Sequence, residues 1–393
     1  MAIDVDTLQQ GFARGGWLPL APPGHPQPMV PESLLPEGDG VLVSSGGSSG
    51  GRQICLQPWS HLDQSATATA LWLQGIGLDP SETLSLNPLP LHHVSGLMPW
   101  WRSRCWGAQH QILSKELMKT PSALRQMSSS SSEWREHSLV LSLVPTQLTR
   151  LMGSVDGVEF LKAVALIWVG GAALPRALAD QARSNGLRLA PCYGATETAA
   201  MVTALHPDQF LAGEEGCGGP LCDVQLRLAN DGSLSVRTKR LALASWSLSR
   251  DKDLQVLADQ NGWWRSGDAA VLGTSLRILG RVDGAILSGG ETIFPEQLEA
   301  RLMQQVVAAG LPPVLVLMLS VRDLVWGERL VALVGSSDEN LTCVLESLAK
   351  AWLPAERPKA WISCPNLQRS VEGKWRRDEW RDWLRSELKY QEH

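Results

Sequence analysis

The chain has 393 residues, of which 44% are hydrophobic and 19% are charged, and its formal net charge at pH 7 is −5. This length suits two or three domains with buried cores, and scattered charges without a basic block argue against a nucleic-acid partner. The longest apolar runs, such as 163–169 and 314–319, are strand-sized. A bilayer span needs about 20 residues, so we expect no integral membrane segment.

The N-terminal segment and the cysteines bear on the compartment. MAIDVDTLQQ carries acids and lacks the apolar stretch of a signal peptide, so we expect a cytoplasmic protein. The seven cysteines include no CxxC pair, and their count is odd. This pattern favours reduced, mostly buried thiols over structural zinc or a disulfide framework.

Two short strands are predicted near the N-terminus, at 40–44 and 53–57, on either side of a Gly/Ser loop. Ser60 is a predicted N-cap for a helix that reaches Leu73. Further on, the serine run 128–132 has low complexity and predicts a surface loop.

A parallel sheet is predicted from residues 163–192. The apolar run 163–169 has the character of a strand buried on both faces. After Gly170-Gly171 a helix is expected, with Pro175 in its first turn and Gly186 at its end, followed by a strand at 187–192. Strand, helix and strand at this spacing form a βαβ unit.

The pattern changes near Leu279. The predicted elements of this part are a helix at 295–307, strands at 314–319 and 330–334, a helix at 341–352 and a Trp-rich helix at 376–388. We therefore predict an α/β fold. Residues 1–280 would form a large domain of parallel and mixed sheets with flanking helices, and residues 281–393 a small α+β domain joined by a hinge.

Five motifs carry candidate chemistry, and each has a plain structural alternative. The loop 44–52 (SSGGSSGGR) offers backbone N–H groups, hydroxyls and Arg52 to an anion, but it lacks the ending of a Walker loop and is equally well a flexible linker. YGATET, at 193–198, follows a predicted parallel strand, where ligands bind in open α/β sheets. An ordinary capped turn explains it as well.

The other three motifs lie further along the chain. GWWRSGD, at 262–268, places an aspartate that could accept hydrogen bonds from a ribose, or simply ends a hairpin. The segment 280–296 (GRVDGAILSGGETIFPE) lies at the predicted domain boundary and reads either as a hinge or as a plain linker. Gly373-Lys374 precedes the last helix, and a lone lysine is usually solvated surface.

Taken together, and in this order, the five motifs resemble the adenylate-forming superfamily of acyl-CoA synthetases, luciferases and peptide-synthetase adenylation domains. The resemblance runs from about Gly40 to Lys374. Within the superfamily, the segments PLHHVSGL at 90–97, VPTQL at 144–148 and VGGAALP at 169–175 are most similar to the o-succinylbenzoate–CoA ligase family. The reaction implied is o-succinylbenzoate, ATP and coenzyme A giving o-succinylbenzoyl-CoA, AMP and pyrophosphate, in menaquinone or phylloquinone biosynthesis.

The resemblance implies roles for individual residues in the first half-reaction. Glu197 would bind Mg²⁺, Thr196 the α-phosphate, and Lys374 the charge that develops there. Tyr193 would stack on adenine. The residues that the resemblance assigns to ATP and its activation are Ser48, Ser49, Gly50, Arg52, Gly171, Ala172, Tyr193, Gly194, Thr196, Glu197, Asp268, Arg281 and Lys374.

For the acid and the second half-reaction, the resemblance implies a pocket bordered by His93, Gln147 and Gly170. The small domain would rotate about Asp283, remove Lys374 and bring the loop Gly289-Gly290-Glu291 to the site for coenzyme A. No residue is assigned to the second carboxylate of o-succinylbenzoate.

Two departures from the family pattern stand out. The Gly/Ser loop is one residue shorter, with Arg52 in place of a lysine, and only about forty residues precede it, so we expect a reduced sheet layer. The oligomeric state stays open, with a homo-oligomer among the options. Three alternatives stay open: a ligase for another aromatic or aliphatic acid, an amino-acid adenylation domain, and a non-catalytic nucleotide-binding relative.

Overall fold

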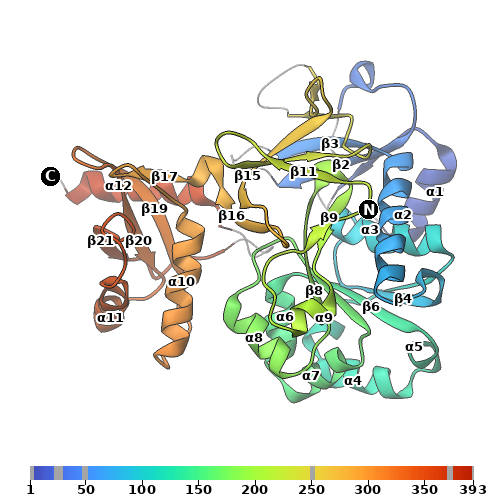
Figure 1. Ribbon diagram of the computed structural model, residues 1–393, viewed down its shortest axis with the longest axis horizontal. Coiled ribbons are helices and arrows are strands. Elements are labelled where there is room, and N and C mark those ends of the chain that lie inside the picture. The colour runs from blue at the N-terminus through green and yellow to red at the C-terminus, as the bar shows by residue number, and fades with distance from the viewer. Residues whose placement is uncertain (1–3, 22–29, 47–51, 248–252, 370–374, 392–393) are drawn as a thin grey trace.

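The computed structural model of the protein describes residues 4–21, 30–46, 52–247, 253–369 and 375–391 (Figure 1). Its helices are α1 (Val5–Arg14), α2 (Trp59–Gly75), α3 (Val94–Trp106), α4 (Pro121–Ser130), α5 (Ser132–Glu136), α6 (Pro145–Met152), α7 (Val155–Lys162), α8 (Arg176–Ser184), α9 (Pro207–Leu211), α10 (Pro295–Ala308), α11 (Glu339–Ala349) and α12 (Arg377–Gln391).

The strands form four sheets. They are β1 (Trp17–Leu20), β2 (Gly40–Gly46), β3 (Arg52–Pro58), β4 (Thr83–Asn87), β5 (Gln109–Ile112), β6 (Ser138–Leu143), β7 (Leu166–Val169), β8 (Leu189–Ala195), β9 (Ala200–Ala204), β10 (Gly219–Pro220), β11 (Gln225–Leu228), β12 (Ser233–Arg237), β13 (Ala244–Trp246), β14 (Gln255–Val256), β15 (Trp263–Val271), β16 (Arg277–Arg281), β17 (Ile286–Ser288), β18 (Glu291–Ile293), β19 (Val316–Asp323), β20 (Gly327–Val334) and β21 (Ala360–Ser363).

The largest sheet has seven strands in the order β10-β9-β8-β7-β6-β4-β5. Its strands β5, β4, β6, β7 and β8 are parallel, and β9 and β10 continue it antiparallel. Helices α4, α6, α7 and α8 bury one face, while α2 and the sheet β11-β12-β15-β16 pack on the other. A sheet covered on both faces explains why β4 and β7 are wholly buried.

A third sheet, β1-β2-β3-β13-β14, packs with α1, α2 and α3. The short 3-10 helix η4 (Thr196–Thr198) contacts β2, β3 and β9. This turn therefore lies where the seven-stranded sheet meets the N-terminal sheet, and the YGATET motif occupies that junction.

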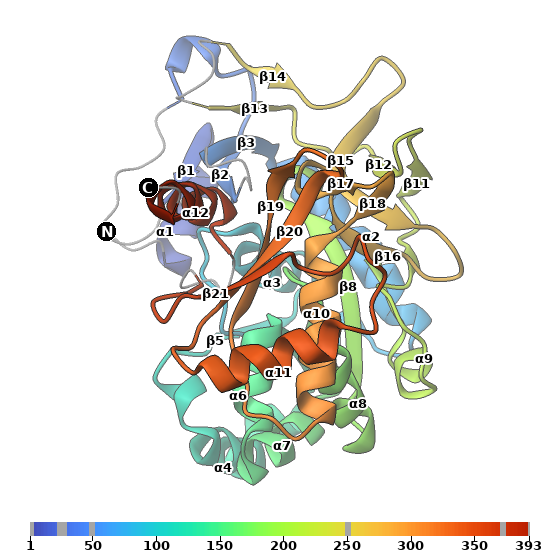
Figure 2. The same ribbon diagram turned by 90° about the vertical axis from the view of Figure 1, so that its left-hand side faces the viewer.

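The C-terminal part, on the left in Figure 1, is built on the sheet β18-β17-β20-β19, to which β21 is added parallel to β20. Helices α10 and α11 cover one face, and α12 covers the other with Leu384 buried and Trp380 and Trp383 packed beside it. Figure 2 views this part from its outer side. Helix α10 also contacts β16 and α8, which belong to the larger part.

The predicted fold class, mixed α/β with a larger N-terminal and a smaller C-terminal part, is confirmed. The βαβ unit is present, since β7 pairs parallel with β8 across α8. The strand predicted at 163–169 is shorter because α7 extends to Lys162.

Two local predictions were wrong. The serine run is not a loop: Ser128 and Ser130 lie in α4, where their hydroxyls donate to carbonyls one turn back, and Ser131 caps α5. Burial of Leu124 and Trp134 on the two flanking helices outweighs the low helix propensity of serine. Ser60 is not an N-cap, because α2 already begins at Trp59.

Among the described residues, no helix combines the length and the apolar character that crossing a membrane requires.

Candidate active site

A hydrogen-bonded chain of polar side chains links three motifs that are far apart in the sequence. The Tyr193 hydroxyl, on β8, donates to Asp268 Oδ2 on β15 at 2.6 Å. Arg281, which ends β16, donates from Nη1 to Asp268 Oδ1 at 3.5 Å and to the carbonyl of Ser266 at 3.0 Å. The motifs YGATET, GWWRSGD and GRVDG therefore meet at one place.

Glycine makes this meeting possible. Gly267 has φ +74°, and a Cβ there would lie 2.8 Å from Arg281 Nη2, so only glycine lets the guanidinium lie across the strand. On its other side, Arg281 donates to both carboxylate oxygens of Asp283, at 3.1 and 3.2 Å. The predicted hinge residue is thus tied to the predicted ribose-binding pair.

The electrostatics of this chain keep Tyr193 a hydrogen-bond donor. Burial, together with the negative charge of Asp268, raises the pKa of Tyr193 well above its usual range. Burial alone would lower the pKa of Arg281, but its contacts with Asp283 and Asp268 outweigh this and raise it.

Thr196 and Glu197 form the start of η4, next to a strained backbone. Ala199 and Ala200 both have positive φ, 50° and 76°, which non-glycine residues adopt at a cost of about 1–2 kcal/mol each. Such strain persists only where the surrounding structure enforces it, and it is concentrated at functional sites.

The Glu197 carboxylate lies near β3, the strand that follows the Gly/Ser loop. It lies against the Cys55 thiol on β3, which also contacts the Ser45 hydroxyl on β2. Burial, and next the charge of Glu197, raise the pKa of Cys55 well above its usual range, so the thiol stays neutral beside the carboxylate. Arg52 is the first residue of β3.

Gly170, Gly171 and Ala172 follow directly after β7, at the carboxyl end of the parallel strands. A Cβ at Gly170 would lie 2.9 Å from the Cys192 sulfur on β8, so the glycine lets the two strands' ends pack closely here.

Sequence reasoning missed a buried cation on this face of the sheet. Arg102, on α3, is 5% exposed, and its guanidinium lies 5.2 Å from the ring centroid of Trp168 on β7. Its Nε and Nη2 atoms, and the indole Nε1 of Trp168, are buried without a hydrogen-bond partner among the described residues. Burial lowers the pKa of Arg102 to about 10, so it stays charged at neutral pH.

Unpaired buried polar groups are rare, because each one costs about 1–3 kcal/mol. The three unpaired groups, two on Arg102 and one on Trp168, are all hydrogen-bond donors. They lie on the same face of the sheet as Cys192. The arrangement is suited to an acceptor-rich anion such as a carboxylate.

Two of the residues predicted to border an acid pocket, His93 and Gln147, lie at the starts of two different helices. His93 is the N-cap residue of α3, and its ring lies 4.3 Å from that of His92. Gln147 folds back on its own helix, where its side-chain oxygen accepts from the Val144 N–H at 3.2 Å.

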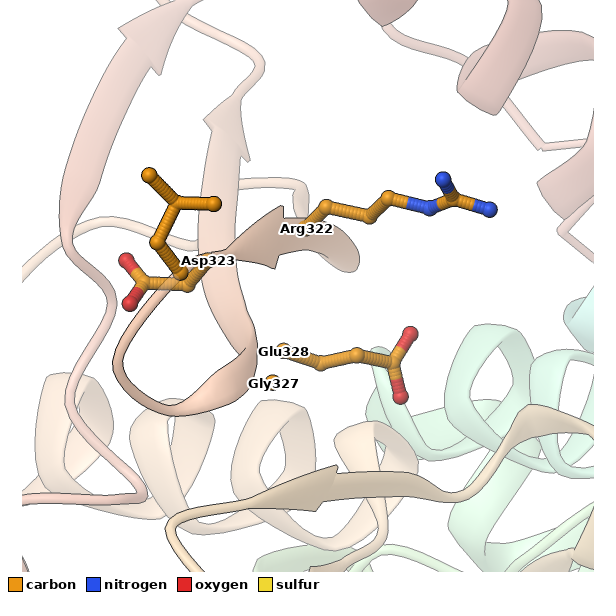
Figure 3. A pocket seen from close by; sticks show the side chains of 5 residues that line it. Arg322, Asp323, Gly327 and Glu328 are labelled. Atoms are coloured by element: carbon orange, nitrogen blue, oxygen red, sulfur yellow. The ribbon is translucent and has the colours of Figure 1, made fainter.

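In the C-terminal part, the Gly289-Gly290-Glu291 loop turns between β17 and β18. Gly289 N donates to the carbonyl of Trp326 at 2.9 Å, and a Cβ on Gly289 would lie 2.5 Å from the Trp326 ring. Beside it, the tip of the β19–β20 hairpin has a hollow of about 370 Å³, and Figure 3 shows the residues that line it. None of those residues is a predicted site residue; they are Arg322, Asp323, Leu324, Gly327 and Glu328.

Four predicted site residues, Ser48, Ser49, Gly50 and Lys374, lie outside the described residues. Within the part that is described, no group of three or more His, Cys, Asp and Glu side chains could hold a metal ion. A magnesium ion at Glu197 would thus need ligands from another source, such as phosphate oxygens and water, which Mg²⁺ commonly uses.

Comparison with known proteins agrees with this geometry. Residues 58–239 match the AMP-binding enzyme family. The matched segment contains the Thr196–Glu197 turn, Tyr193, Arg102 and the Gly170-Gly171 turn.

Over a longer span, the chain is similar to 2-succinylbenzoate–CoA ligases. It is 32% identical to that of Escherichia coli K12, over 75% of this chain and 59% of the relative. The Salmonella typhimurium LT2 ligase is 34% identical, over 71% and 55%. The chain thus spans a little over half the length of these curated relatives.

Solved structures show the same similarity in three dimensions. Wild-type E. coli MenE with a bound phenylether-linked analogue of OSB-AMS is 28% identical, with a TM-score of 0.61 over 88% of this chain and 69% of that one. The o-succinylbenzoate CoA synthetase from Bacillus subtilis, in complex with the acyl-adenylate intermediate OSB-AMP, superposes with a TM-score of 0.70 over 86% and 68%. At 23% identity, the second likeness shows the fold alone.

Proposed function

We propose that the protein is an adenylate-forming acid–thiol ligase that converts o-succinylbenzoate, ATP and coenzyme A to o-succinylbenzoyl-CoA, AMP and pyrophosphate, a step of menaquinone or phylloquinone biosynthesis. The observation that carries the proposal is the convergence of Tyr193, Asp268 and Arg281 beside the strained turn at Thr196 and Glu197. The similarity to 2-succinylbenzoate–CoA ligases supports the same reaction. A ligase for another acid, or a non-catalytic nucleotide-binding relative, is the alternative.

In the first half-reaction, a carboxylate oxygen of the acid bonds to the α-phosphorus of ATP and pyrophosphate leaves. Tyr193 would stack on adenine, Asp268 and Arg281 would hold the ribose, and Thr196 would donate to the α-phosphate. The nucleotide set would also include Ser48, Ser49, Gly50, Arg52, Gly171, Ala172 and Gly194, with Lys374 neutralising the charge that develops on the phosphoryl oxygens.

The Glu197 carboxylate fits a magnesium ion that travels with the nucleotide. It lies beside Cys55 on β3, the strand that follows the Gly/Ser loop, and a single carboxylate completed by phosphate and water is a common Mg²⁺ site. When bound, the ion would withdraw charge from the phosphoryl oxygens. The protein's own part is to hold Glu197 at the required position.

The acid would lie on the face of the sheet that carries Gly170, with His93 and Gln147 at its border. Arg102 is our candidate for the second carboxylate of o-succinylbenzoate. Its unpaired Nε and Nη2 atoms, with the indole N–H of Trp168, would receive carboxylate oxygens in a site that excludes water. A monocarboxylic acid would leave these donors unsatisfied.

In the second half-reaction, the coenzyme A thiolate attacks the acyl carbon and AMP leaves. We propose that residues 281–393 rotate as a unit about Asp283 relative to residues 1–280. This movement would withdraw Lys374 and bring Gly289, Gly290 and Glu291 to the adenylate. The expected partners are small molecules only, and the expected compartment is the cytoplasm. Light scattering of the purified protein decides whether it is a homo-oligomer.

The test is a panel of aromatic and dicarboxylic acids, scored for AMP formation with and without coenzyme A. We expect o-succinylbenzoate to have the highest kcat/KM. Arg102→Met should raise the KM for o-succinylbenzoate about 10- to 100-fold, since a charge-assisted pair contributes about 1.5–3 kcal/mol, and should leave the KM for benzoate unchanged.

The same substitution has a second, opposite readout. Because Arg102 is an unpaired buried charge, Arg102→Met should raise the Tm of the ligand-free protein. Arg104→Met is the matched control, since Arg104 lies on the same helix but over the Phe12 ring. A preference for benzoate or a fatty acid would refute the o-succinylbenzoate assignment, and no AMP from any acid would refute the ligase.

A further inference from the structure

The backbone from Thr196 to Met201 is fixed at every carbonyl. The Gln57 amide donates to the carbonyls of Thr196 and Glu197, at 2.8 and 3.3 Å. The Ala242 N–H donates to the same Glu197 carbonyl at 2.7 Å. The Ser65 hydroxyl donates to Ala199 at 2.7 Å. Donors from β3, from α2 and from the segment after β12 thus converge on one turn.

The remaining carbonyls of the turn depend on Arg240 and on Thr198. Thr198 Oγ1 donates to the carbonyl of Ala200 at 2.7 Å. Arg240 donates from Nη1 to the carbonyl of Thr198 and from Nη2 to that of Met201, the latter at 2.9 Å. The guanidinium therefore spans the two residues with positive φ, Ala199 and Ala200, from one side to the other.

Arg240 is built into the interior for this purpose. It is 0% exposed, and its charge is balanced by Asp223, whose Oδ2 accepts from Nε at 2.7 Å. A buried charge is costly unless it is paired and fully hydrogen-bonded, and here the partners are one carboxylate, two carbonyls and the Ser65 hydroxyl, the last at 3.4 Å. A planar fork with fixed N–H directions meets two carbonyls at once, which a lysine ammonium cannot do as well.

We propose that Arg240 is a positioning residue for Thr196 and Glu197. It holds the strained Ala199–Ala200 backbone, which directs the Thr196 hydroxyl and the Glu197 carboxylate toward the phosphates and their metal ion. The inference rests on the proposed function for what those two side chains bind. Because Arg240 is fully buried, it would contact neither the nucleotide nor the metal ion itself.

The test uses Arg240→Met and Arg240→Lys in the full chain, with ATP binding measured by calorimetry in the presence and absence of Mg²⁺. We expect Arg240→Met to lose most of the gain in ATP affinity that Mg²⁺ gives the wild type, because Glu197 is no longer held in place. The rate of AMP formation should fall about 10- to 100-fold, as expected for a misplaced catalytic group. Arg240→Lys should recover part of both effects.

Arg183 supplies a matched control. It is a largely buried arginine on α8 that also bonds two carbonyls, those of Phe210 and Glu214, and one carboxylate, that of Asp180. Arg183→Met should lower the Tm and leave the Mg²⁺ effect on ATP affinity at the wild-type value.

If Arg240→Met behaves like Arg183→Met, with a lower Tm and an unchanged Mg²⁺ effect, Arg240 has no positioning role. If Arg240→Met does not fold, Arg240→Lys decides: an unchanged Mg²⁺ effect in that variant overturns the proposal. Failure of the wild type to form AMP from any acid would refute the ligase but not this inference, because the calorimetry needs no turnover.

Discussion

The Tyr193 hydroxyl donates to Asp268 Oδ2 at 2.6 Å, so the residue expected to stack on adenine also orients the carboxylate expected to hold the ribose. Since burial and the Asp268 charge raise the pKa of Tyr193, the hydroxyl remains a donor throughout the pH range of an assay. One oxygen of Asp268 is thus already engaged, and Arg281 approaches the other.

Tyr193→Phe tests this relationship. The ring is kept, but the carboxylate loses a donor that holds its orientation. We expect the KM for ATP to rise about 3- to 10-fold, the equivalent of a hydrogen bond worth about 1 kcal/mol, with kcat nearly unchanged. Steady-state kinetics with varied ATP measures both. A lower KM would mean that Tyr193 competes with the ribose for Asp268.

Gly289→Ala tests the loop assigned to the coenzyme A step. A methyl group at Gly289 would lie 2.5 Å from the Trp326 ring, and φ there is +59°. We expect thioester formation from preformed adenylate to slow at least 10-fold, and AMP formation without coenzyme A to stay near the wild-type rate. Gly290→Ala carries the same kind of backbone strain, with φ +89°, but its methyl group would meet no atom within 4 Å, so its effect should be milder. Equal damage to both half-reactions would contradict the assignment.

Because of His110, we expect the free energy of unfolding to depend on pH in the acid range. Burial lowers its pKa to about 4, and its Nε2 lies 3.1 Å from Asn87 Nδ2, a donor, so the ring is neutral there. Below about pH 6.5 the unfolded chain binds a proton that the folded chain takes up only near pH 4. The free energy of unfolding should therefore fall as the pH drops through this window, by at most about 1.4 kcal/mol per pH unit from this group.

The matched variant is His110→Gln, whose side-chain oxygen can accept from Asn87 without titrating. Urea unfolding between pH 7 and 4 should show a shallower loss of stability for the variant than for the wild type. Parallel curves would show that His110 does not contribute. Because Asn87 also bonds Leu89 N–H and the carbonyl of Gly96, the proton would loosen the loop that carries His93.

Lys374→Ala tests the two-conformation mechanism. The proposed nucleotide-binding residues Thr196 and Asp268 lie in the larger part of the fold, and Lys374 lies near the C-terminal end of the chain. We expect adenylation to fall about 100-fold or more, as when other charge-stabilising groups are removed. Thioester formation from preformed acyl-adenylate should stay close to the wild-type rate. Lys350→Ala, an exposed lysine after α11, is the control.

Local patterns in the sequence were enough to predict the helices and strands that bury a regularly spaced row of apolar side chains. The helix with Leu298, Leu302 and Val306 on one face, and the two strands that follow it, are present at nearly the predicted positions. Boundaries shifted where a bulky side chain had to be buried, as with Trp59 at the start of α2 and Trp134 after the serine run.

The residues that support the site could not be predicted in the same way. The burial of Arg102 is predictable from its spacing. Arg102 lies four residues after the buried Met98 and so shares the apolar face of its helix. Nothing in the sequence around Arg240 indicates that it is buried, because Lys239-Arg240 after a strand is an ordinary surface pattern. Its partners Ser65 and Met201 are distant in sequence, and no local pattern encodes such a contact.

The turn at Thr196 also constrains the order in which the chain can fold. It is held by Gln57, 139 residues away, and by Ser65, 134 residues from its partner Ala199. Contacts of such long range close late, after the local helices and hairpins have formed. The segment 58–239 excludes Gln57, Arg240 and Ala242, so a fragment with those limits would contain the Thr196–Glu197 turn without most of the donors that shape it. A nascent chain could complete this turn only after residue 242 had left the ribosome.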